Sequence, residues 1–399
     1  MCRPKKTARW GPGMCRNLLQ FACDAVHSYV QCNTAYLSRV NQAQVQAITT
    51  RLIHEESRAQ NSRERYRTVT TIPMPPLISL EDHFISKAFQ SSESAATLAF
   101  HLFPPTVLEN LLDLTEQRIS ALDTAGIAVQ VVSHSPATES PGMCRWSNEQ
   151  LHRGIQKANG RLAGFAMLPM ADSDAAVEEL THCVKNLGFV GTLVPNHARG
   201  TYYDGDEYLQ PFAKAVELDV PIYLHPTPPT PAKRQEFIGN YSEEVTTVLS
   251  CQGWNWHADV AVHLLRLYAA GIFDKLPKLR IIIGHMGEML PMMVDRIQAR
   301  LGHIWKERQR TFIEVWRQNV WITISGMPYL GPFLALLKST TPDKILFSVD
   351  YPFEDNVELA NFMHVLRSSG VVNEEELEGI MYRNAESLLK VKCRSDLGF

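Results

Sequence analysis

From Leu77 onward, short apolar runs alternate with segments of helical periodicity. Apolar runs rich in β-branched residues and bounded by turn residues predict strands. The eight predicted strands cover residues 77–81, 127–133, 162–169, 190–195, 220–226, 279–285, 320–325 and 345–352. Between them, apolar residues recur three and four positions apart, which predicts helices. The clearest of these helical segments are 175–188, 208–219 and 357–370, and the first and last of them end in glycine.

Regular alternation of strands and helices predicts an α/β fold, and eight strands favour a (β/α)8 TIM-type barrel. The rival architecture is a doubly wound open sheet, which often carries a G-x-G-x-x-G turn after an early strand. No such turn follows an early strand in this sequence. We therefore predict a (β/α)8 barrel over residues 77–399.

Residues 1–76 differ from the barrel region in composition. They hold 11 Lys and Arg residues against 4 Asp and Glu residues, and Pro73, Pro75 and Pro76 mark the boundary. We predict a basic, weakly structured extension with one helix around residues 42–56. An Arg-rich, acid-poor start also fits a mitochondrial presequence, and a misassigned start codon is a further alternative.

The composition of the whole chain narrows the class of protein. With 45% hydrophobic and 20% charged residues, it is typical of a soluble globular protein. The net charge of −10 over residues 77–399 argues against nucleic acid as a partner, and no apolar stretch is long enough to predict a membrane span. None of the eight cysteines forms a C-x-x-C pair, so reduced thiols and a cytoplasmic location are expected.

Polar residues end four of the eight predicted strands, at the face of a barrel where chemistry takes place. These residues are Glu81, Asp82 and His83 after the first strand, His225 after the fifth, His285 after the sixth and Asp350 after the eighth. Strand alternation places Glu81 and His83 on one side and Asp82 on the other. Imidazole and carboxylate groups together suit Zn²⁺ or Mn²⁺ with one position left open. The pattern therefore predicts a metal site at this face.

Five motifs resemble the amidohydrolase superfamily. They are LEDHF (80–84), RISALDTAGIAVQVVS (118–133), PIYLHPTPP (221–229), GIFDKLPKLRIIIGHMGEMLP (271–291) and FSVDYPFE (347–354). The resemblance is to its decarboxylase branch, which is related to the aminocarboxymuconate-semialdehyde, 2,3-dihydroxybenzoate and γ-resorcylate decarboxylases. The motifs occur in the family's order across nearly all of residues 77–399, and residues 1–76 have no counterpart.

The resemblance implies roles for individual residues. The implied ligands of a single divalent metal ion, Zn²⁺ or Mn²⁺ with Mg²⁺ as an alternative, are Glu81, His83, His225 and Asp350. His285, paired with Glu288, would act as an acid or base beside the metal. Many hydrolases of the superfamily open with H-x-H and use a lysine after the fourth strand to bridge two metals. This chain has Glu81 in the first position and VPNH at 194–197, which favours one metal ion.

The implied function is metal-dependent, non-oxidative decarboxylation of an ortho-hydroxybenzoate such as a dihydroxybenzoate, orsellinate or methylsalicylate. The chain would then be a carboxy-lyase of aromatic acid or secondary metabolism. Asp350 would protonate the ring carbon, and His285 with Glu288 would handle the phenolic proton. Two alternatives are a metal-dependent hydrolase of a lactone or related cyclic compound and a non-catalytic binding module. The family resemblance also implies a homo-oligomer, either a dimer or a tetramer.

Aromatic residues near these motifs are candidate substrate contacts, because they suit a flat ring and exclude water. The candidates are Phe84, Trp254, Trp256 and Tyr351, together with Arg296 as a clamp for a carboxylate or phenolate. Packing at the rim and a surface ion pair are the ordinary alternatives. Arg118 is expected to orient a loop. His257 is either a substrate contact or a hydrogen-bonded loop histidine, and we favour the second interpretation.

Overall fold

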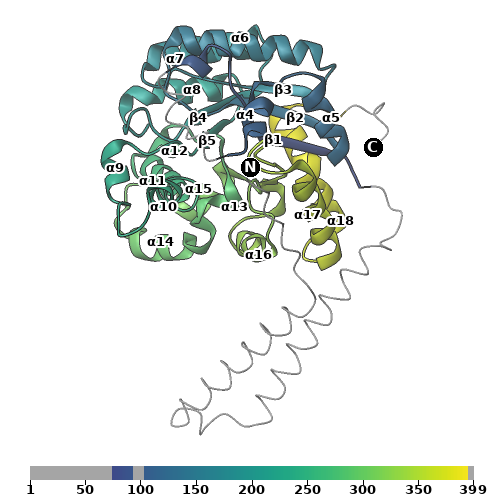
Figure 1. Ribbon diagram of the computed structural model, residues 1–399. Coiled ribbons are helices and arrows are strands. Elements are labelled where there is room, and N and C mark those ends of the chain that lie inside the picture. The colour runs from purple at the N-terminus through teal and green to yellow at the C-terminus, as the bar shows by residue number, and fades with distance from the viewer. Residues whose placement is uncertain (1–73, 93–102, 394–399) are drawn as a thin grey trace, which may run out of the picture. The chain divides into compact units, whose positions relative to one another are not determined.

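The computed structural model describes residues 74–92 and 103–393. Eight parallel strands follow one another in sequence order, with helices packed around them (Figure 1). The strands are β1 (Leu77–Phe84), β2 (Ile127–His134), β3 (Leu162–Ala166), β4 (Gly191–Pro195), β5 (Ile222–His225), β6 (Ile281–Ile283), β7 (Val320–Thr323) and β8 (Ile345–Leu346). The predicted (β/α)8 barrel and all eight predicted strands are confirmed. The helix expected around residues 42–56 lies outside the described residues, as does most of the predicted extension.

Helices connect and cover the strands. The α-helices are α4 (Pro105–Leu112), α5 (Glu116–Ala125), α6 (Pro141–Lys157), α7 (Ser173–Lys185), α8 (Leu209–Glu217), α9 (Pro231–Gln235), α10 (Glu243–Ser250), α11 (Asn255–Ala269), α12 (Ile272–Lys275), α13 (His285–Glu288), α14 (Val294–Leu301), α15 (Phe312–Asn319), α16 (Leu330–Ser339), α17 (Asn356–Ser369), α18 (Glu374–Glu378) and α19 (Asn384–Leu389). Shorter turns are η1 (Phe89–Ser91), η3 (Asp206–Tyr208), η4 (Leu290–Met292), η5 (Pro342–Lys344) and the π-helical η6 (Gly379–Arg383). None of the helices in the described ranges is long and apolar enough to cross a bilayer.

The three clearest helix predictions correspond to α7, α8 and α17. Gly370 ends α17 with a φ of 65°, a left-handed conformation that glycine adopts without a steric penalty. The glycine predicted to end α7 lies further out, because Asn186 is the C-cap and Gly188 follows with a φ of 72°. Helix ends therefore differ from the prediction by a few residues, as is usual for boundaries read from sequence.

Successive residues of a strand pack on opposite sides of the barrel wall. Tyr223 in β5 and Ile282 in β6 belong to an apolar cluster built from several strands and α19. The residues on either side of them belong instead to the larger cluster that includes the surrounding helices; these are Ile222, Leu224, Ile281 and Ile283. Because both faces of each strand are covered, the strands appear in the sequence as nearly continuous apolar runs.

Polar contacts, rather than a backbone ladder, join β1 to the segment that follows β8 in the described part of the chain. The Glu81 N–H donates to Ser348 Oγ at 2.7 Å. Further along, the His83 N–H donates to the Tyr351 carbonyl at 2.7 Å, and the Tyr351 N–H donates to Asp82 Oδ1 at 2.9 Å. We call this junction the β1–β8 seam. It brings the polar end of the first strand next to the polar end of the last.

Trp316 in α15 is fully buried, and its indole N–H donates to the Ser339 carbonyl at 3.1 Å. We expect Trp316→Ala to lower the free energy of unfolding by about 3–5 kcal/mol, because the cavity it leaves cannot fully collapse. Urea unfolding followed by circular dichroism measures the loss. Trp146→Ala in α6 is the control, since that side chain is 43% exposed, and it should change stability far less. Equal losses in the two variants would contradict the packing described here.

Candidate metal centre and active site

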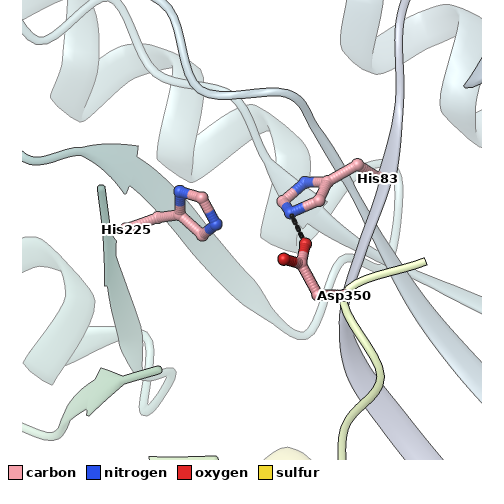
Figure 2. A group of neighbouring side chains, drawn as sticks. All are labelled: His83, His225 and Asp350. Carbon is pink, nitrogen blue, oxygen red and sulfur yellow. Dashed lines mark ion pairs between the residues drawn. The ribbon is translucent and has the colours of Figure 1, made fainter. Parts of the chain in front are cut away.

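Four side chains converge at the carboxyl-terminal ends of the strands. Glu81 and His83 belong to β1, His225 ends β5, and Asp350 follows β8. His83 Nε2 lies 3.1 Å from Asp350 Oδ1, and His225 Nε2 lies 3.1 Å from Glu81 Oε1. Figure 2 shows the imidazoles of His83 and His225 and the carboxylate of Asp350 turned toward a common space, with ligand atoms that all lie within 4.8 Å of one another. The structure thus brings together all four residues of the expected ligand set.

Among the described residues, the atoms that face this space make no hydrogen bonds, although they lie close to one another. They are Glu81 Oε1, His83 Nε2, His225 Nε2 and Asp350 Oδ1, and all four are buried. An unsatisfied buried polar atom costs about 1–3 kcal/mol, so four of them in one place call for a ligand that binds all of them. A divalent cation does so, and two imidazole nitrogens with two carboxylate oxygens suit Zn²⁺ and Mn²⁺. The residues present therefore fit a metal ion.

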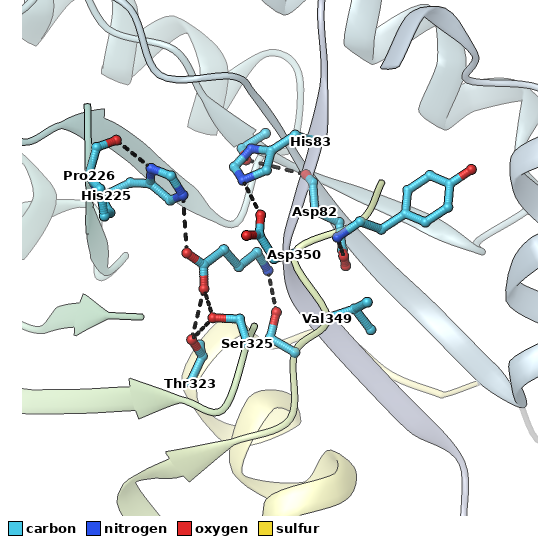
Figure 3. Close-up of polar contacts among 12 residues, drawn as sticks. Asp82, His83, His225, Pro226, Thr323, Ser325, Val349 and Asp350 are labelled. Atoms are coloured by element: carbon cyan, nitrogen blue, oxygen red, sulfur yellow. Dashed lines mark hydrogen bonds and ion pairs between the residues drawn. The ribbon is translucent and has the colours of Figure 1, made fainter. Parts of the chain in front are cut away.

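The remaining polar atoms of these side chains are held by the protein. His225 Nδ1 donates to the Pro226 carbonyl at 2.7 Å, which leaves the lone pair of Nε2 directed at the centre. Glu81 Oε2 accepts a hydrogen bond from Thr323 Oγ1 at 2.9 Å and others from the hydroxyl groups of Ser325 and Tyr223. Figure 3 shows the hydroxyl groups of Thr323 and Ser325 next to each other, below His225. These contacts fix the orientation of the side chains before any ligand binds.

The electrostatics of the site favour the protonation states that a metal requires. Burial by itself would raise the pKa of Glu81, but the imidazoles of His285 and His225 outweigh it and hold that pKa well below its ordinary value. Burial lowers the pKa of His83, although Asp350 opposes the shift. A carboxylate and a neutral imidazole are the forms that coordinate a cation.

His285 and Glu288 form the expected pair, with His285 Nδ1 2.9 Å from Glu288 Oε1. Burial favours the neutral form of Glu288, but His285 and His257 together lower its pKa to about 2. On its other side, His285 Nε2 lies 3.8 Å from both Glu81 Oε1 and Asp350 Oδ2. His285 therefore stands between a fully buried carboxylate and the candidate metal centre.

The backbone that carries this pair has an unusual conformation. φ is positive at five successive residues, from 48° at His285 to 65° at Met289, with Gly287 at 90°. Residues other than glycine rarely adopt this left-handed backbone conformation, and residues that do so are often found at functional sites. This left-handed turn folds Glu288 back onto His285.

His257 is a second partner of Glu288 that the sequence did not reveal. Its Nδ1 lies 2.7 Å from Glu288 Oε2, and its Nε2 lies 3.1 Å from the Gln252 carbonyl. The interpretation of His257 as a loop residue is wrong, because it lies in the first turn of α11. The two residues are 31 positions apart, and no local pattern in the sequence links them.

A cavity opens beside the candidate metal centre. Its walls contain His83, His225, His285 and Asp350, the apolar residues Phe103, Pro136, Pro226, Pro228, Trp256 and Phe353, and the polar residues Ser135, Gln252 and Glu354. Aromatic and proline side chains next to the candidate metal ligands suit a small aromatic acid.

Of the five predicted substrate contacts, Trp256 lines this cavity and the other four do not. Phe84 is buried in the apolar core, and Tyr351 is buried at the β1–β8 seam. Trp254 is 52% exposed at the N-terminus of α11, and Arg296 is exposed on α14. Sequence position alone did not separate these locations, because the loops after the strands determine which side chains turn inward.

Comparisons with known proteins identify the family of this chain. The amidohydrolase family profile matches residues 115–391. The decarboxylase orsB of Emericella nidulans is 43% identical over 329 residues, which cover 81% of this chain and 99% of that protein. A γ-resorcylate decarboxylase of Polaromonas sp. is 33% identical, over 79% of this chain and 98% of that protein.

The solved structures that resemble this chain include dihydroxybenzoate decarboxylases. A 2,6-dihydroxybenzoate decarboxylase in complex with 2,6-dihydroxybenzoate has a TM-score of 0.71 and 31% identity, over 79% of this chain and all of that one. The dihydroxybenzoic acid decarboxylase of Polaromonas sp., which contains manganese and the inhibitor 2-nitroresorcinol, also has a TM-score of 0.71, with 32% identity over 82% of this chain and all of that one. The chain belongs to the amidohydrolase superfamily, in the branch that contains the resorcylate and dihydroxybenzoate decarboxylases.

Proposed function

We propose that this protein is a metal-dependent, non-oxidative decarboxylase of an aromatic acid that carries a hydroxyl group ortho to its carboxylate. The observation that carries the proposal is the set of four buried ligand atoms that make no hydrogen bond among the described residues, beside a cavity with aromatic and proline walls. The similarity to decarboxylases that act on resorcylate and dihydroxybenzoate supports the same reaction class.

Glu81, His83, His225 and Asp350 would hold one divalent ion, either Zn²⁺ or Mn²⁺. When bound, such an ion supplies a Lewis acid beside the substrate carboxylate and phenolic oxygen. The manganese named for a relative of known structure supports this assignment. The apolar side chains of the cavity would exclude bulk water from the ring and align its plane, so that the substrate oxygens face the metal ligands.

Asp350 is the proposed acid. Its side chain is 17% exposed, and the residue lines the cavity, so its carboxyl group is placed beside a bound ring. Asp350 would give a proton to the ring carbon that bears the carboxylate, which interrupts aromaticity. The bond from this carbon to the carboxylate then breaks, its electrons restore the ring and CO₂ leaves, and Asp350 regains a proton from solvent. General acid catalysis of this kind contributes about 10²–10⁴-fold to the rate.

His285 is the proposed holder of the phenolic proton. Its Nε2 faces the cavity, while its Nδ1 is fixed by the ionised Glu288. His257 holds the second oxygen of Glu288 and so keeps that carboxylate in place. This arrangement orients one imidazole nitrogen toward the substrate throughout the reaction.

A hydrolase of a lactone would use the same metal centre to activate water. The aromatic and proline walls of the cavity favour decarboxylation, because they suit a planar ring. An assay that follows both CO₂ release and lactone ring opening distinguishes the two reactions.

We also propose that the protein is a cytoplasmic homo-oligomer. Large apolar side chains are exposed on the contacting elements η4 and α16, at Met292 and Leu334, which supports burial against another subunit. The four cysteines in the described ranges are free thiols, which supports a reducing compartment.

Metal removal tests the centre directly. We expect chelator-treated protein to lose CO₂ release from ortho-hydroxybenzoic acids and added Mn²⁺ to restore it. Mn²⁺ should also raise the Tm of the metal-free protein, because a ligand that binds only the folded state stabilises it. His225→Ala removes one ligand and should abolish that rise in Tm. Full activity after metal removal would contradict the proposal.

Asp350→Asn tests the proposed acid. Asparagine cannot donate the required proton, so kcat for CO₂ release should fall by about 10²–10⁴-fold. Asp355→Asn is the matched control, because Asp355 caps α17 through the N–H groups of Val357 and Glu358, and asparagine caps about as well. The control should keep its activity. An active Asp350→Asn enzyme would refute the role of Asp350.

Glu288→Gln tests the carboxylate between the two histidines. An amide presents only one acceptor, so it cannot receive a hydrogen bond from both His285 and His257. We expect kcat to fall by about 10–100-fold, the usual effect of removing such a supporting group. Glu358→Gln, at an exposed position on α17, should leave kcat unchanged. Equal kcat values for wild type and Glu288→Gln would count against the proposed pair.

A further inference from the structure

Arg118 in α5 is fully buried, and every part of its guanidinium group is bonded to the protein interior. Nη2 donates to the carbonyls of His83 at 2.7 Å and Asn110 at 3.0 Å. Nη1 donates to Gln130 Oε1 at 3.1 Å, and Nε donates to the Asp113 carbonyl at 2.7 Å. One side chain thus connects α5 to α4, to the loop between these helices, to β2 and to the end of β1.

The same guanidinium also contacts the other side of the β1–β8 seam. Its central carbon lies 4.9 Å from the centre of the Tyr351 ring, and Tyr351 directly follows Asp350. Tyr351 accepts the His83 N–H through its carbonyl at 2.7 Å. Arg118 therefore contacts the candidate ligand His83 and also Tyr351, the residue next to the candidate ligand Asp350.

A buried cation is costly to keep unless the fold uses its contacts. Within the described part of the chain, no carboxylate lies within ion-pair distance of Arg118; its acceptors are carbonyl groups and one amide. No continuous ladder fixes β1 against β8 at this point, so their separation depends on individual contacts. Arg118 supplies two of these contacts, one to the His83 carbonyl in β1 and one to the Tyr351 ring after β8.

We propose that Arg118 is a positioning residue for the metal centre, which fixes His83 and Asp350 by joining the end of β1 to the segment after β8. This inference rests on the proposed function only in taking these two side chains as metal ligands. Arginine is required because lysine lacks the planar fork of donors that reaches several acceptors at once. Loss of the contact should loosen the ligand geometry and weaken metal affinity.

Arg161 is the matched control. It is 7% exposed, and it donates to the carbonyls of Ile127 and Ala128 at 2.8 Å each and to Asp123 Oδ1 at 2.6 Å. These carbonyls lie at the start of β2, whereas the candidate metal centre is at the ends of the strands. A variant at Arg161 therefore perturbs a buried arginine of the same barrel away from the ligands.

The experiment compares Arg118→Lys, Arg118→Met and Arg161→Lys in the full chain. The dissociation constant for Mn²⁺ is measured on metal-stripped protein, by competition with a chelator, at a temperature below every Tm. The Tm of each metal-free variant is measured separately. We expect all three variants to have a lower Tm, and only the Arg118 variants to bind Mn²⁺ about 10–100-fold more weakly. If Arg118→Met does not fold, Tyr351→Leu replaces it, with weaker Mn²⁺ binding again expected.

Two results would overturn the inference: wild-type Mn²⁺ affinity in folded Arg118 variants, or an equal loss of affinity in Arg161→Lys. The outcome is separable from that of the proposed reaction. Wild-type protein that binds Mn²⁺ but releases no CO₂ refutes the decarboxylase assignment and leaves the role of Arg118 standing. An active decarboxylase whose Arg118 variants bind Mn²⁺ normally refutes only the role of Arg118.

Discussion

The ligand atoms of Glu81, His83, His225 and Asp350 face one another in the barrel with no other hydrogen-bond partner among the described residues. Such an arrangement is unfavourable in the absence of a cation, because oxygen and nitrogen atoms that carry lone pairs are held close together away from water. The surrounding structure keeps them there nevertheless. The strand ends place them at the same face of the barrel, and the β1–β8 seam holds His83 next to Asp350.

The support for each ligand comes from a different part of the barrel. Glu81 is fixed from β5 and β7, through Tyr223, Thr323 and Ser325. His225 is fixed by the carbonyl of the next residue, and His83 lies within hydrogen-bond distance of Ser133 at the end of β2. Because these contacts are distributed around the barrel, the geometry of the centre depends on closure of the whole fold rather than on one loop.

His285 and Glu288, the proposed acid–base pair, are held by a turn and a helix rather than by strand ends. A left-handed turn after β6 brings Glu288 back onto His285, and α11 adds His257 on the opposite side of the carboxylate. Two imidazoles around one buried carboxylate offset its desolvation and keep it ionised. The result is a fixed hydrogen-bond acceptor behind an imidazole that faces the cavity.

The sequence by itself determined the barrel and the positions of the candidate ligands. Eight apolar runs separated by helical segments specify eight strands covered on both faces, and polar residues at strand ends must then meet at one face because all the strands are parallel. Only the tertiary structure decided the rest. Whether Trp256 or Trp254 turns inward, whether His257 reaches Glu288, and where the guanidinium of Arg118 lies depend on loop paths and on packing between segments far apart in the chain. Such contacts leave no periodic signal, because the two partners are chosen by the closed barrel and not by their neighbours in sequence.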